Sequence, residues 1–196
     1  MDDRLKKQLD FALEMDKQKG IGRQTYILNA LRKENDAEHG WHLALMTLLL
    51  SEYSNEKIDV QRTVAMVIVH DVIEIDAGDT YAYDSKGNAT KRERELKAAD
   101  RIFSILPSDQ EKYFRGLWDE FEEKKTPEAK FATAMDSLEP IMLNDASNGL
   151  AWREHKVCAD QVLNRIENKI KPGSEVLYKW AVDLVNENIT KGNLIR

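Results

Sequence analysis

The sequence predicts an all-α fold, and three features lead to that prediction. Apolar residues recur three and four positions apart along most of the chain, which is the spacing of one face of an α-helix. Capping boxes, which start helices, stand at Thr90-Lys91-Arg92-Glu93 and Ser108-Asp109-Gln110-Glu111. No linker is long enough to divide the 196 residues, a length that suits one domain with a substantial core. We therefore expect a single helical domain over residues 1–196.

The N-terminal part is expected to begin with two helices. Residues 2–18 place leucines on one face at helical spacing, and two glycines end the pattern. The segment around Arg23 reads as irregular. Asn35 or Asp36 can then cap a helix that continues to about Tyr53.

A third helix is expected to follow Asp59 and to run to about Ile75. It is continuously apolar over residues 64–69, so we expect it to lie at the centre of the fold. Residues 76–90 then read as a polar loop. A loop of this length beside a functional site could form a wall or lid, and a solvated surface loop with two incidental tyrosines is the alternative.

The C-terminal half contains four further expected helices and one that carries a proline. Thr126-Pro127 places a cap and a proline at a helix start, and Pro140 should kink or locally disrupt the same helix. The expected helices cover about residues 91–106, 108–124, 127 onward through Asp136, 159–170 and 174–190.

Composition limits the kinds of protein that the chain can be. The net charge is −6 and charged residues make up 33% of the chain, which leaves no broad basic surface for a nucleic-acid polymer. The single cysteine, Cys158, excludes an intramolecular disulfide and fits a reducing compartment. The sequence has no apolar signal core and no run approaching the roughly 20 apolar residues of a membrane span. We expect a soluble cytoplasmic protein that does not bind membranes.

The apolar third helix leads into an adjacent histidine–aspartate pair, His70-Asp71. Ionisable groups beside an apolar segment are costly to bury unless they pair or bind a metal. A lone histidine there would more often be a polar residue on a helix face. Here a second histidine, His39, and a further aspartate, Asp136, are possible partners. Two imidazoles and two carboxylates form a mixed ligand set that suits a borderline divalent ion.

The order of these residues resembles the HD-domain metal-dependent phosphohydrolase superfamily. The strings ENDAEH at residues 34–39, HDVIE at 70–74 and GD at 78–79 resemble its 5′-deoxynucleotidase-like branch, and the resemblance covers roughly residues 20–170. It implies a helical HD domain with a bound divalent metal that hydrolyses a small phosphate ester. The metal ligands that it implies are His39, His70, Asp71 and Asp136.

The number of metal ions follows from the remaining histidines. Two-metal members of the superfamily recruit further histidines, whereas this chain has only His42 and His155 besides the two implied ligands. His42 lies one turn after His39, but the helix face that follows is apolar, so we expect it to support a ligand or to pack. One ion is therefore expected, and Mn²⁺, Co²⁺, Mg²⁺, Fe²⁺ and Ni²⁺ remain open as its identity.

Two further acids could carry the proton transfers. Hydrolysis of a phosphomonoester needs neutralised phosphoryl charge, an activated water and a protonated leaving oxygen. Glu74 lies one turn after His70, and Asp79 follows soon after, so together they can supply the acid and the base. Which carboxylate takes which role stays open. The alternatives are a salt bridge for Glu74 and an ordinary turn residue for Asp79.

A phosphate group also needs cations, and Arg23 and Lys91 are the expected substrate-binding residues. In the branch that the chain resembles, an arginine followed by tryptophan precedes the first metal histidine. Here Arg23 is followed by Gln24, so selectivity between deoxyribose and ribose stays open. The other candidate cations are Arg32, Lys33, Arg92 and Arg94.

The sequence therefore predicts a metal-dependent phosphomonoesterase that converts nucleoside 5′-monophosphates to nucleosides and phosphate. One alternative is an HD hydrolase acting on another phosphate ester, either a nucleoside triphosphate or a cyclic phosphodiester. Another is a catalytically silent helical module that binds a metal. Glu74 and Asp79 favour an enzyme, because a structural ion would not require them. The resemblance also implies a homodimer.

Overall fold

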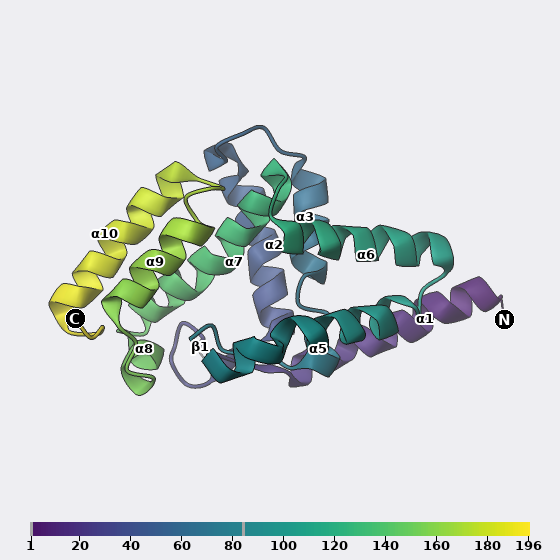
Figure 1. Ribbon diagram of the computed structural model, residues 1–196, viewed down its shortest axis with the longest axis horizontal. Helices are drawn as coiled ribbons and strands as arrows, with labels where there is room; N and C mark the ends of the chain where they lie inside the picture. Colours follow the sequence, from purple (N-terminus) through teal and green to yellow (C-terminus); the bar gives the residue numbers. More distant parts are fainter. Residues whose placement is uncertain (1, 84) are drawn as a thin grey trace.

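The computed structural model describes residues 2–83 and 85–196 (Figure 1). Helices dominate this part of the chain, and two short strands accompany them, so the all-α prediction is confirmed. The helices are α1 (Asp3–Met15), α2 (Asp36–Leu50), α3 (Val60–Val69), α4 (Glu74–Ala77), α5 (Ser85–Phe103), α6 (Ser108–Glu123), α7 (Pro127–Ala146), α8 (Leu150–Glu154), α9 (Ala159–Lys169) and α10 (Glu175–Lys191). The 3₁₀ segments are Asp16–Gly20 and Ser51–Tyr53, and the strands are β1 (Gly22–Tyr26) and β2 (Lys33–Asn35).

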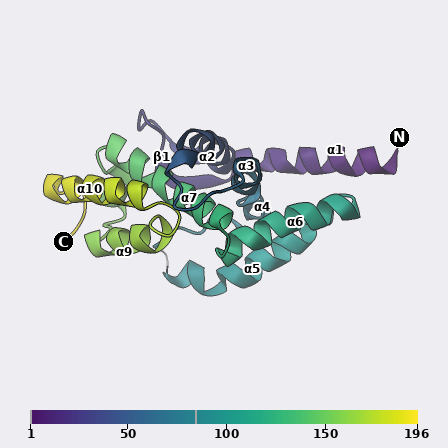
Figure 2. The same ribbon diagram turned by 90° about the horizontal axis from the view of Figure 1, so that it is seen from above.

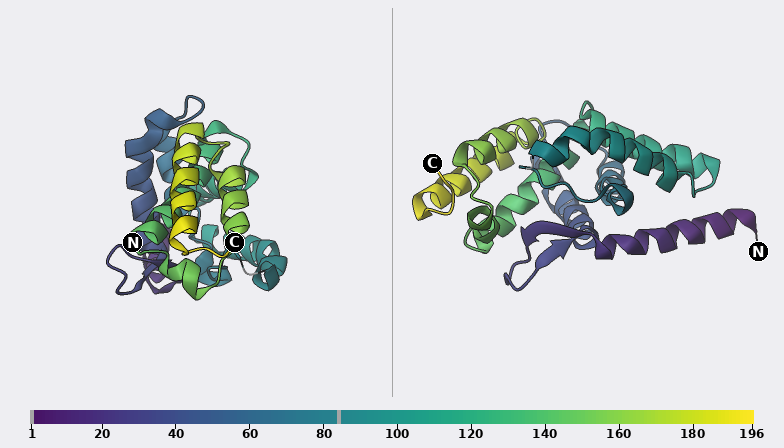
Figure 3. Two further views of the ribbon diagram at one scale, coloured as in Figure 1. Left: turned by 90° about the vertical axis from the view of Figure 1, so that its left-hand side faces the viewer. Right: turned by 60° about the horizontal axis from the view of Figure 1, so that its bottom comes forward.

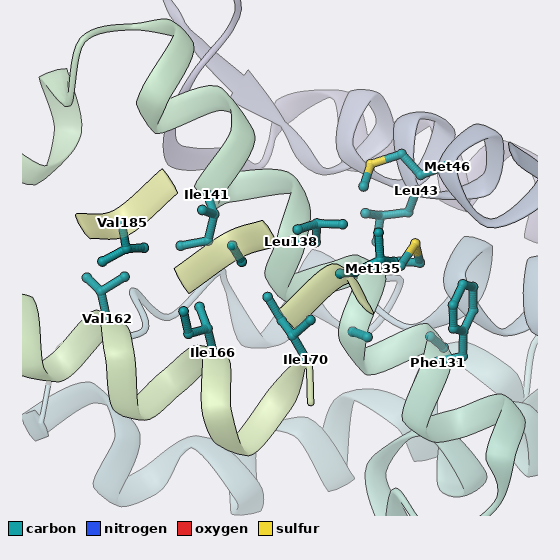
Figure 4. Packing of buried hydrophobic residues seen from close by; sticks show 14 of the residues in the cluster. Leu43, Met46, Phe131, Met135, Leu138, Ile141, Val162, Ile166, Ile170 and Val185 are labelled. Carbon is teal, nitrogen blue, oxygen red and sulfur yellow. The ribbon is translucent and has the colours of Figure 1, made fainter. Parts of the chain in front are cut away.

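Helix α7 runs through the middle of the fold, with α2 and α3 on one side and α9 and α10 on the other (Figure 1). A helix that is apolar over most of its surface can satisfy all of those contacts only from a central position. Side chains from α2, α7, α9 and α10 point toward one another and form the main core (Figure 4). The residues labelled there are Leu43, Met46, Phe131, Met135, Leu138, Ile141, Val162, Ile166, Ile170 and Val185.

A second, smaller core lies under α5 and α6. Trp118 and Phe103, each almost fully buried, pack there against Val69 and Ile73 from the end of α3 and the turn that follows it. Helix α1 extends outward beside α6 (Figures 2 and 3). It has no buried residue and is attached by contacts such as Phe11 on α1 with Phe114 on α6. Helix α1 therefore contributes no residue to the buried core, which is formed around α7.

The segment expected to be irregular forms an antiparallel hairpin of β1 and β2. The strands are short and lack a regular apolar alternation, so local sequence gave no strand signal. They are instead held from outside, where β1 packs against α7 and α8 and β2 packs against α2. The hairpin places Arg23 and Glu34 side by side, facing the interior.

The expected helix from Asp59 to Ile75 is interrupted. Helix α3 ends at Val69, and the chain then makes turns whose hydrogen bonds join residues three apart, such as Glu74 N to Asp71 O at 3.0 Å. Helix α4 resumes at Glu74. In this interrupted segment the adjacent side chains of His70 and Asp71 face each other at 3.1 Å, and Asp71 also approaches Glu74. Adjacent residues of a continuous helix point about 100° apart.

The expected loop over residues 76–90 is shorter than predicted, since α5 already begins at Ser85; Asp84 lies outside the described residues. Pro140 does not end α7, which continues to Ala146. The carbonyl oxygen of Pro140 accepts a hydrogen bond from the Asn144 side chain, Nδ2, at 2.7 Å. No helix in the described part of the chain is both long enough and apolar enough to span a lipid bilayer.

Candidate metal centre and active site

His39 is positioned by the first turn of α2. Asn35 is the N-cap, and a capping box joins it to Glu38 in both directions, at 3.0 and 3.1 Å. This cap satisfies the free backbone donors at the helix start and fixes where the first turn points. His39 follows directly and is fully buried.

His70 is positioned by the end of α3. Its Nδ1 lies 2.8 Å from the Val67 carbonyl oxygen, which can only accept a hydrogen bond. Nδ1 therefore carries the proton and Nε2 keeps its lone pair, the tautomer that metal-binding histidines use. Nε2 is buried and has no hydrogen-bond partner among the residues that the structure describes.

The four implied metal ligands come together at one point. His39 Nε2 lies 3.3 Å from Asp136 Oδ1, and His70 Nε2 lies 3.1 Å from Asp71 Oδ2. The crossed distances are 3.7 Å for His70 to Asp136 and 3.9 Å for His39 to Asp71. Two ligand atoms that each lie about 2.1 Å from one ion are themselves about 3.0–3.4 Å apart. The His39–Asp136 and His70–Asp71 distances match this spacing, and the two crossed distances exceed it. Ligand atoms of His39, His70 and Asp136 all lie within 4.8 Å of one another, a grouping that could hold one divalent ion, with Asp71 beside it.

The electrostatics of the cluster also suit a cation. Burial and Arg23 lower the pKa of His39, but Glu139 and Asp136 outweigh them and raise it to about 9. Burial disfavours the charged form of Asp136, yet its interactions with the neighbouring imidazoles of His39 and His70 hold its pKa well below the usual range. The cluster thus attracts positive charge strongly, and a metal ion competes with protons for these same atoms.

Buried carboxylates that sequence reasoning missed surround the cluster. Glu139 is fully buried one turn after Asp136 on α7 and lies 3.3 Å from His39 Nδ1 and 3.1 Å from His42 Nδ1. Its carboxylate faces the ring nitrogen of His39 that points away from Asp136, a position from which it can orient the imidazole. Glu34 is also close, at 3.8 Å from His39 Nδ1, and burial together with Glu139 raises its pKa to about 8.

Glu74 and Asp79 lie beside this cluster. Glu74 is only 4% exposed, and its Oε2 has no hydrogen-bond partner among the described residues. Burial and the neighbouring charges of Asp71, Asp79 and Asp36 raise its pKa well above the usual range. Asp79 follows Gly78, whose φ of +73° is a conformation that favours glycine. Burial also raises the pKa of Asp79, despite the opposing charge of Arg23.

Arg23 lies deeper than expected for a residue that only meets substrate. Its guanidinium contacts Asp71 Oδ2 at 2.9 Å, Glu34 Oε1 at 3.2 Å and Asp36 Oδ1 at 3.6 Å. Asp36 is 1% exposed, and neither of its carboxylate oxygens has a hydrogen-bond partner in the described part of the chain. Arg23 therefore balances the charge of several acids at once.

The other predicted cations divide between the site and the surface. Lys91 lines the site and lies 3.3 Å from Glu95. Arg32 pairs with Glu38 at the surface instead. Arg94 donates to the Ala77 carbonyl and to Thr80 Oγ1, at 2.9 Å for the latter, and so supports the turn that precedes Asp79.

These side chains line a cavity of about 270 Å³. That volume is close to the lower end of the roughly 300–1,000 Å³ typical of ligand pockets. The lining combines implied metal ligands, implied acid–base residues and both implied substrate cations, namely His70, Asp71, Asp136, Glu74, Asp79, Arg23 and Lys91. Gln24 also lines it, and its Oε1 accepts from Lys33 Nζ at 2.7 Å and lies 3.1 Å from His155 Nε2.

Comparison with known proteins agrees with the resemblance seen in the sequence. The human and bovine proteins named 5′-deoxynucleotidase HDDC2 are each 31% identical over 114 residues, covering 58% of this chain and 54% of each relative. The aligned segment thus spans about half the length of these curated relatives. A crystal structure described as a predicted metal-dependent phosphohydrolase from Magnetospirillum magnetotacticum is 42% identical, with a TM-score of 0.94 over 98% of this chain and 96% of that one.

More distant structures share the fold. A conserved hypothetical protein from Pyrococcus furiosus has a TM-score of 0.64 at 22% identity, over 93% of this chain and 99% of that one. The sequence profile described as HD domain matches residues 15–178, which is most of the chain and includes every residue of the cluster. The predicted resemblance is therefore confirmed, and the chain belongs to the HD domain family.

Proposed function

We propose that this protein is a metal-dependent phosphomonoesterase that hydrolyses nucleoside 5′-monophosphates to nucleosides and inorganic phosphate, with residues 1–196 acting as one HD-type domain. The observation that carries the proposal is the grouping of His39, His70 and Asp136, with Asp71 and Glu74 beside it, at a small cavity that His70, Asp71, Glu74 and Asp136 line. The relatives named 5′-deoxynucleotidase support the substrate class.

In this mechanism His39, His70, Asp71 and Asp136 would hold one divalent ion, which would supply a Lewis acid for the phosphoryl oxygen and a bound water of lowered pKa. Glu74 and Asp79 move protons between the attacking water and the leaving oxygen. The raised pKa values of Glu74 and Asp79 support this role, because two nearby carboxyl groups that do not ionise independently can share a proton.

The residue types favour some metals over others without choosing one. Imidazole and carboxylate together suit Mn²⁺, Fe²⁺, Co²⁺ and Ni²⁺, and the carboxylates also accommodate Mg²⁺. We propose one ion from this group. Protein stripped with a chelator and reloaded with each ion should recover phosphatase activity with at least one of them, and the native metal is then identified by elemental analysis of untreated protein.

The test of the substrate class is a comparison of matched nucleotides. We expect 2′-deoxyadenosine and adenosine 5′-monophosphates to differ by no more than about tenfold in kcat/KM, equivalent to 1.4 kcal/mol. The physical reason is Gln24, a half-buried amide with two polar neighbours that can meet a hydroxyl but is not left unpaired without one. A hundredfold deoxy preference would show that another residue excludes the 2′-hydroxyl. Inactivity on every monophosphate would contradict the proposed function.

Replacing Arg23 with alanine should lower kcat/KM for both nucleotides alike. Its charge would act on the phosphate, which both nucleotides carry, and on Asp71, which lies 2.9 Å away in the protein. Hydrogen bonds to charged groups contribute about 1.5–3 kcal/mol, or roughly 10- to 100-fold. Arg32→Ala is the matched control, since Arg32 is 54% exposed and pairs with Glu38 outside the cavity. An effect on one nucleotide alone would instead place Arg23 at the sugar.

We further propose that the protein is a cytoplasmic homodimer and does not bind nucleic-acid polymers or membranes. Trp41, Leu45, Leu48 and Leu49 are 41–69% exposed on one face of α2, and such clustered apolar side chains are typical of an interface. Two copies that pack this face together would bury the same residues on each side. Light scattering should give a dimer for the wild type and a monomer for Trp41→Glu; a monomeric wild type would contradict the proposal.

A further inference from the structure

The cavity has a cationic end that the proposed mechanism does not use. Three basic residues line it together with His70 and Asp136. Lys124 ends α6 in a left-handed conformation with φ of +55°, and Arg165 and Lys169 lie one turn apart on α9. Helix α9 packs along α7, which starts just after Lys124, so these residues from separate parts of the sequence meet at the same cavity (Figure 1).

These three cations have no ion-pair partner among the acids that the structure describes. Across residues 2–83 and 85–196, no carboxylate lies within 4.0 Å of their charged nitrogens. The acids nearby have other partners, since Glu122 pairs with Arg92 at 3.3 Å and Glu95 pairs with Lys91 at 3.3 Å. The charge of Asp136 favours the charged form of Lys169, but burial, Lys124 and Arg165 outweigh it. Gathering three cations with so little counter-charge is unfavourable, and an anionic ligand reduces that cost.

The pKa of Lys169 reflects the repulsion among these three cations. Burial, followed by hydrogen bonding and repulsion from Lys124 and by the charge of Arg165, lowers the pKa of Lys169 to about 8. A bound anion would raise that pKa again, because it favours the charged ammonium. The cluster is therefore in a state that an anion stabilises.

Aromatic side chains complete this part of the lining. Tyr81, Tyr83 and Trp152 line the cavity, and the Tyr81 ring lies 5.3 Å from Tyr83 and 4.5 Å from the ring of His155. Flat apolar surfaces of this kind suit the ring of a nucleobase. One cavity thus offers a phosphate-activating cluster, an aromatic wall and a group of three cations without an ion-pair partner in the described part of the chain.

We propose that Lys124, Arg165 and Lys169 form an anion subsite, and that the preferred substrate carries a second anionic group, a phosphate or a carboxylate, besides the phosphate ester that is cleaved. This inference rests on the proposed function and narrows its substrate class. A nucleoside 3′,5′-bisphosphate and a 5′-monophosphate with a carboxylated base are the two chemical sources of the second anion.

The test compares kcat/KM for release of the 5′-phosphate. Wild-type protein should prefer adenosine 3′,5′-bisphosphate to adenosine 5′-monophosphate, or orotidine 5′-monophosphate to uridine 5′-monophosphate, by at least about tenfold, and whichever pair shows the preference identifies the anion. Arg165→Gln and Lys169→Gln should each reduce that preference by about 10-fold or more, the size of a lost charge-assisted hydrogen bond. Lys179→Gln, at an exposed position of α10, should leave the preference unchanged.

The outcomes separate this inference from the proposed function. Equal kcat/KM values within both pairs would overturn the subsite while leaving the phosphatase in place. Variants that weaken substrates with one anionic group and substrates with two anionic groups alike would do the same. If the wild type hydrolyses no monoester, calorimetric titration with adenosine 3′,5′-bisphosphate still reports binding. Weaker binding by Arg165→Gln than by wild type and Lys179→Gln would then support the subsite, whereas equal binding would overturn it. Circular dichroism confirms that each variant is folded.

Discussion

Replacing Asp136 with alanine is expected to abolish stoichiometric metal binding and, with it, phosphatase activity. Asp136 is the only one of the four implied ligands contributed by α7, and its Oδ1 lies 3.3 Å from His39 Nε2 and 3.7 Å from His70 Nε2. Removing it leaves two buried imidazoles with a single aspartate and an open side toward the cavity. Metal content by elemental analysis and turnover of a nucleoside 5′-monophosphate measure the two effects.

The same loss is expected for alanine at the other three positions, His39, His70 and Asp71. The matched control is Asp145→Ala, which removes an acid from the same helix whose partners are Asn188 and Lys191 rather than the histidines. That variant should keep its metal and its turnover. A full complement of metal in Asp136→Ala would remove Asp136 from the site, and loss of metal in Asp145→Ala would trace the effect to disturbance of α7.

The residues that could be predicted are those whose signal is local. An N-cap at Asn35 or Asp36 could be predicted because a cap depends on nearby side chains, and the structure places the cap at Asn35, shortly before His39. The capping boxes predicted at Thr90 and Ser108 were wrong, because α5 already begins at Ser85 and α6 has Pro107 as its N-cap without a side-chain hydrogen bond. The hairpin was missed because its strands are stabilised by contacts with distant helices rather than by their own pattern. The break after Val69 was missed for a related reason, since the sequence there continues an apolar helical pattern without a proline or glycine.

The carboxylates around the histidines show a limit of another kind. Glu139 and His39 are separated by 100 positions, and only the packing of α2 on α7 brings them together. In sequence, a glutamate within an apolar helix reads as part of its solvated face. For Arg23, the residue type predicted a contact with the substrate phosphate. The structure shows it paired with Glu34, Asp36 and Asp71, so it also balances the charge of these buried acids, which its sequence position did not indicate.

Glu74→Gln should separate binding from chemistry, because it keeps the size of the side chain and removes only its ability to carry and release a proton. We expect the metal to stay, since Glu74 is not among the four converging ligands, and turnover to fall by about 10²–10⁴, the usual contribution of a general acid or base. Metal content and kcat are measured on the same preparation.

Glu122→Gln is the matched control, because Glu122 lines the same cavity but is paired with Arg92. It should retain nearly all turnover, so that a loss confined to Glu74→Gln cannot come from the general change in cavity charge. Glu74 differs from Glu122 in being 4% exposed, in having an oxygen without a partner in the described residues and in a pKa raised by burial and by Asp71. Those properties suit a group that exchanges protons near neutral pH. Near-normal turnover in Glu74→Gln would exclude that role and leave Asp79 as the acid–base residue.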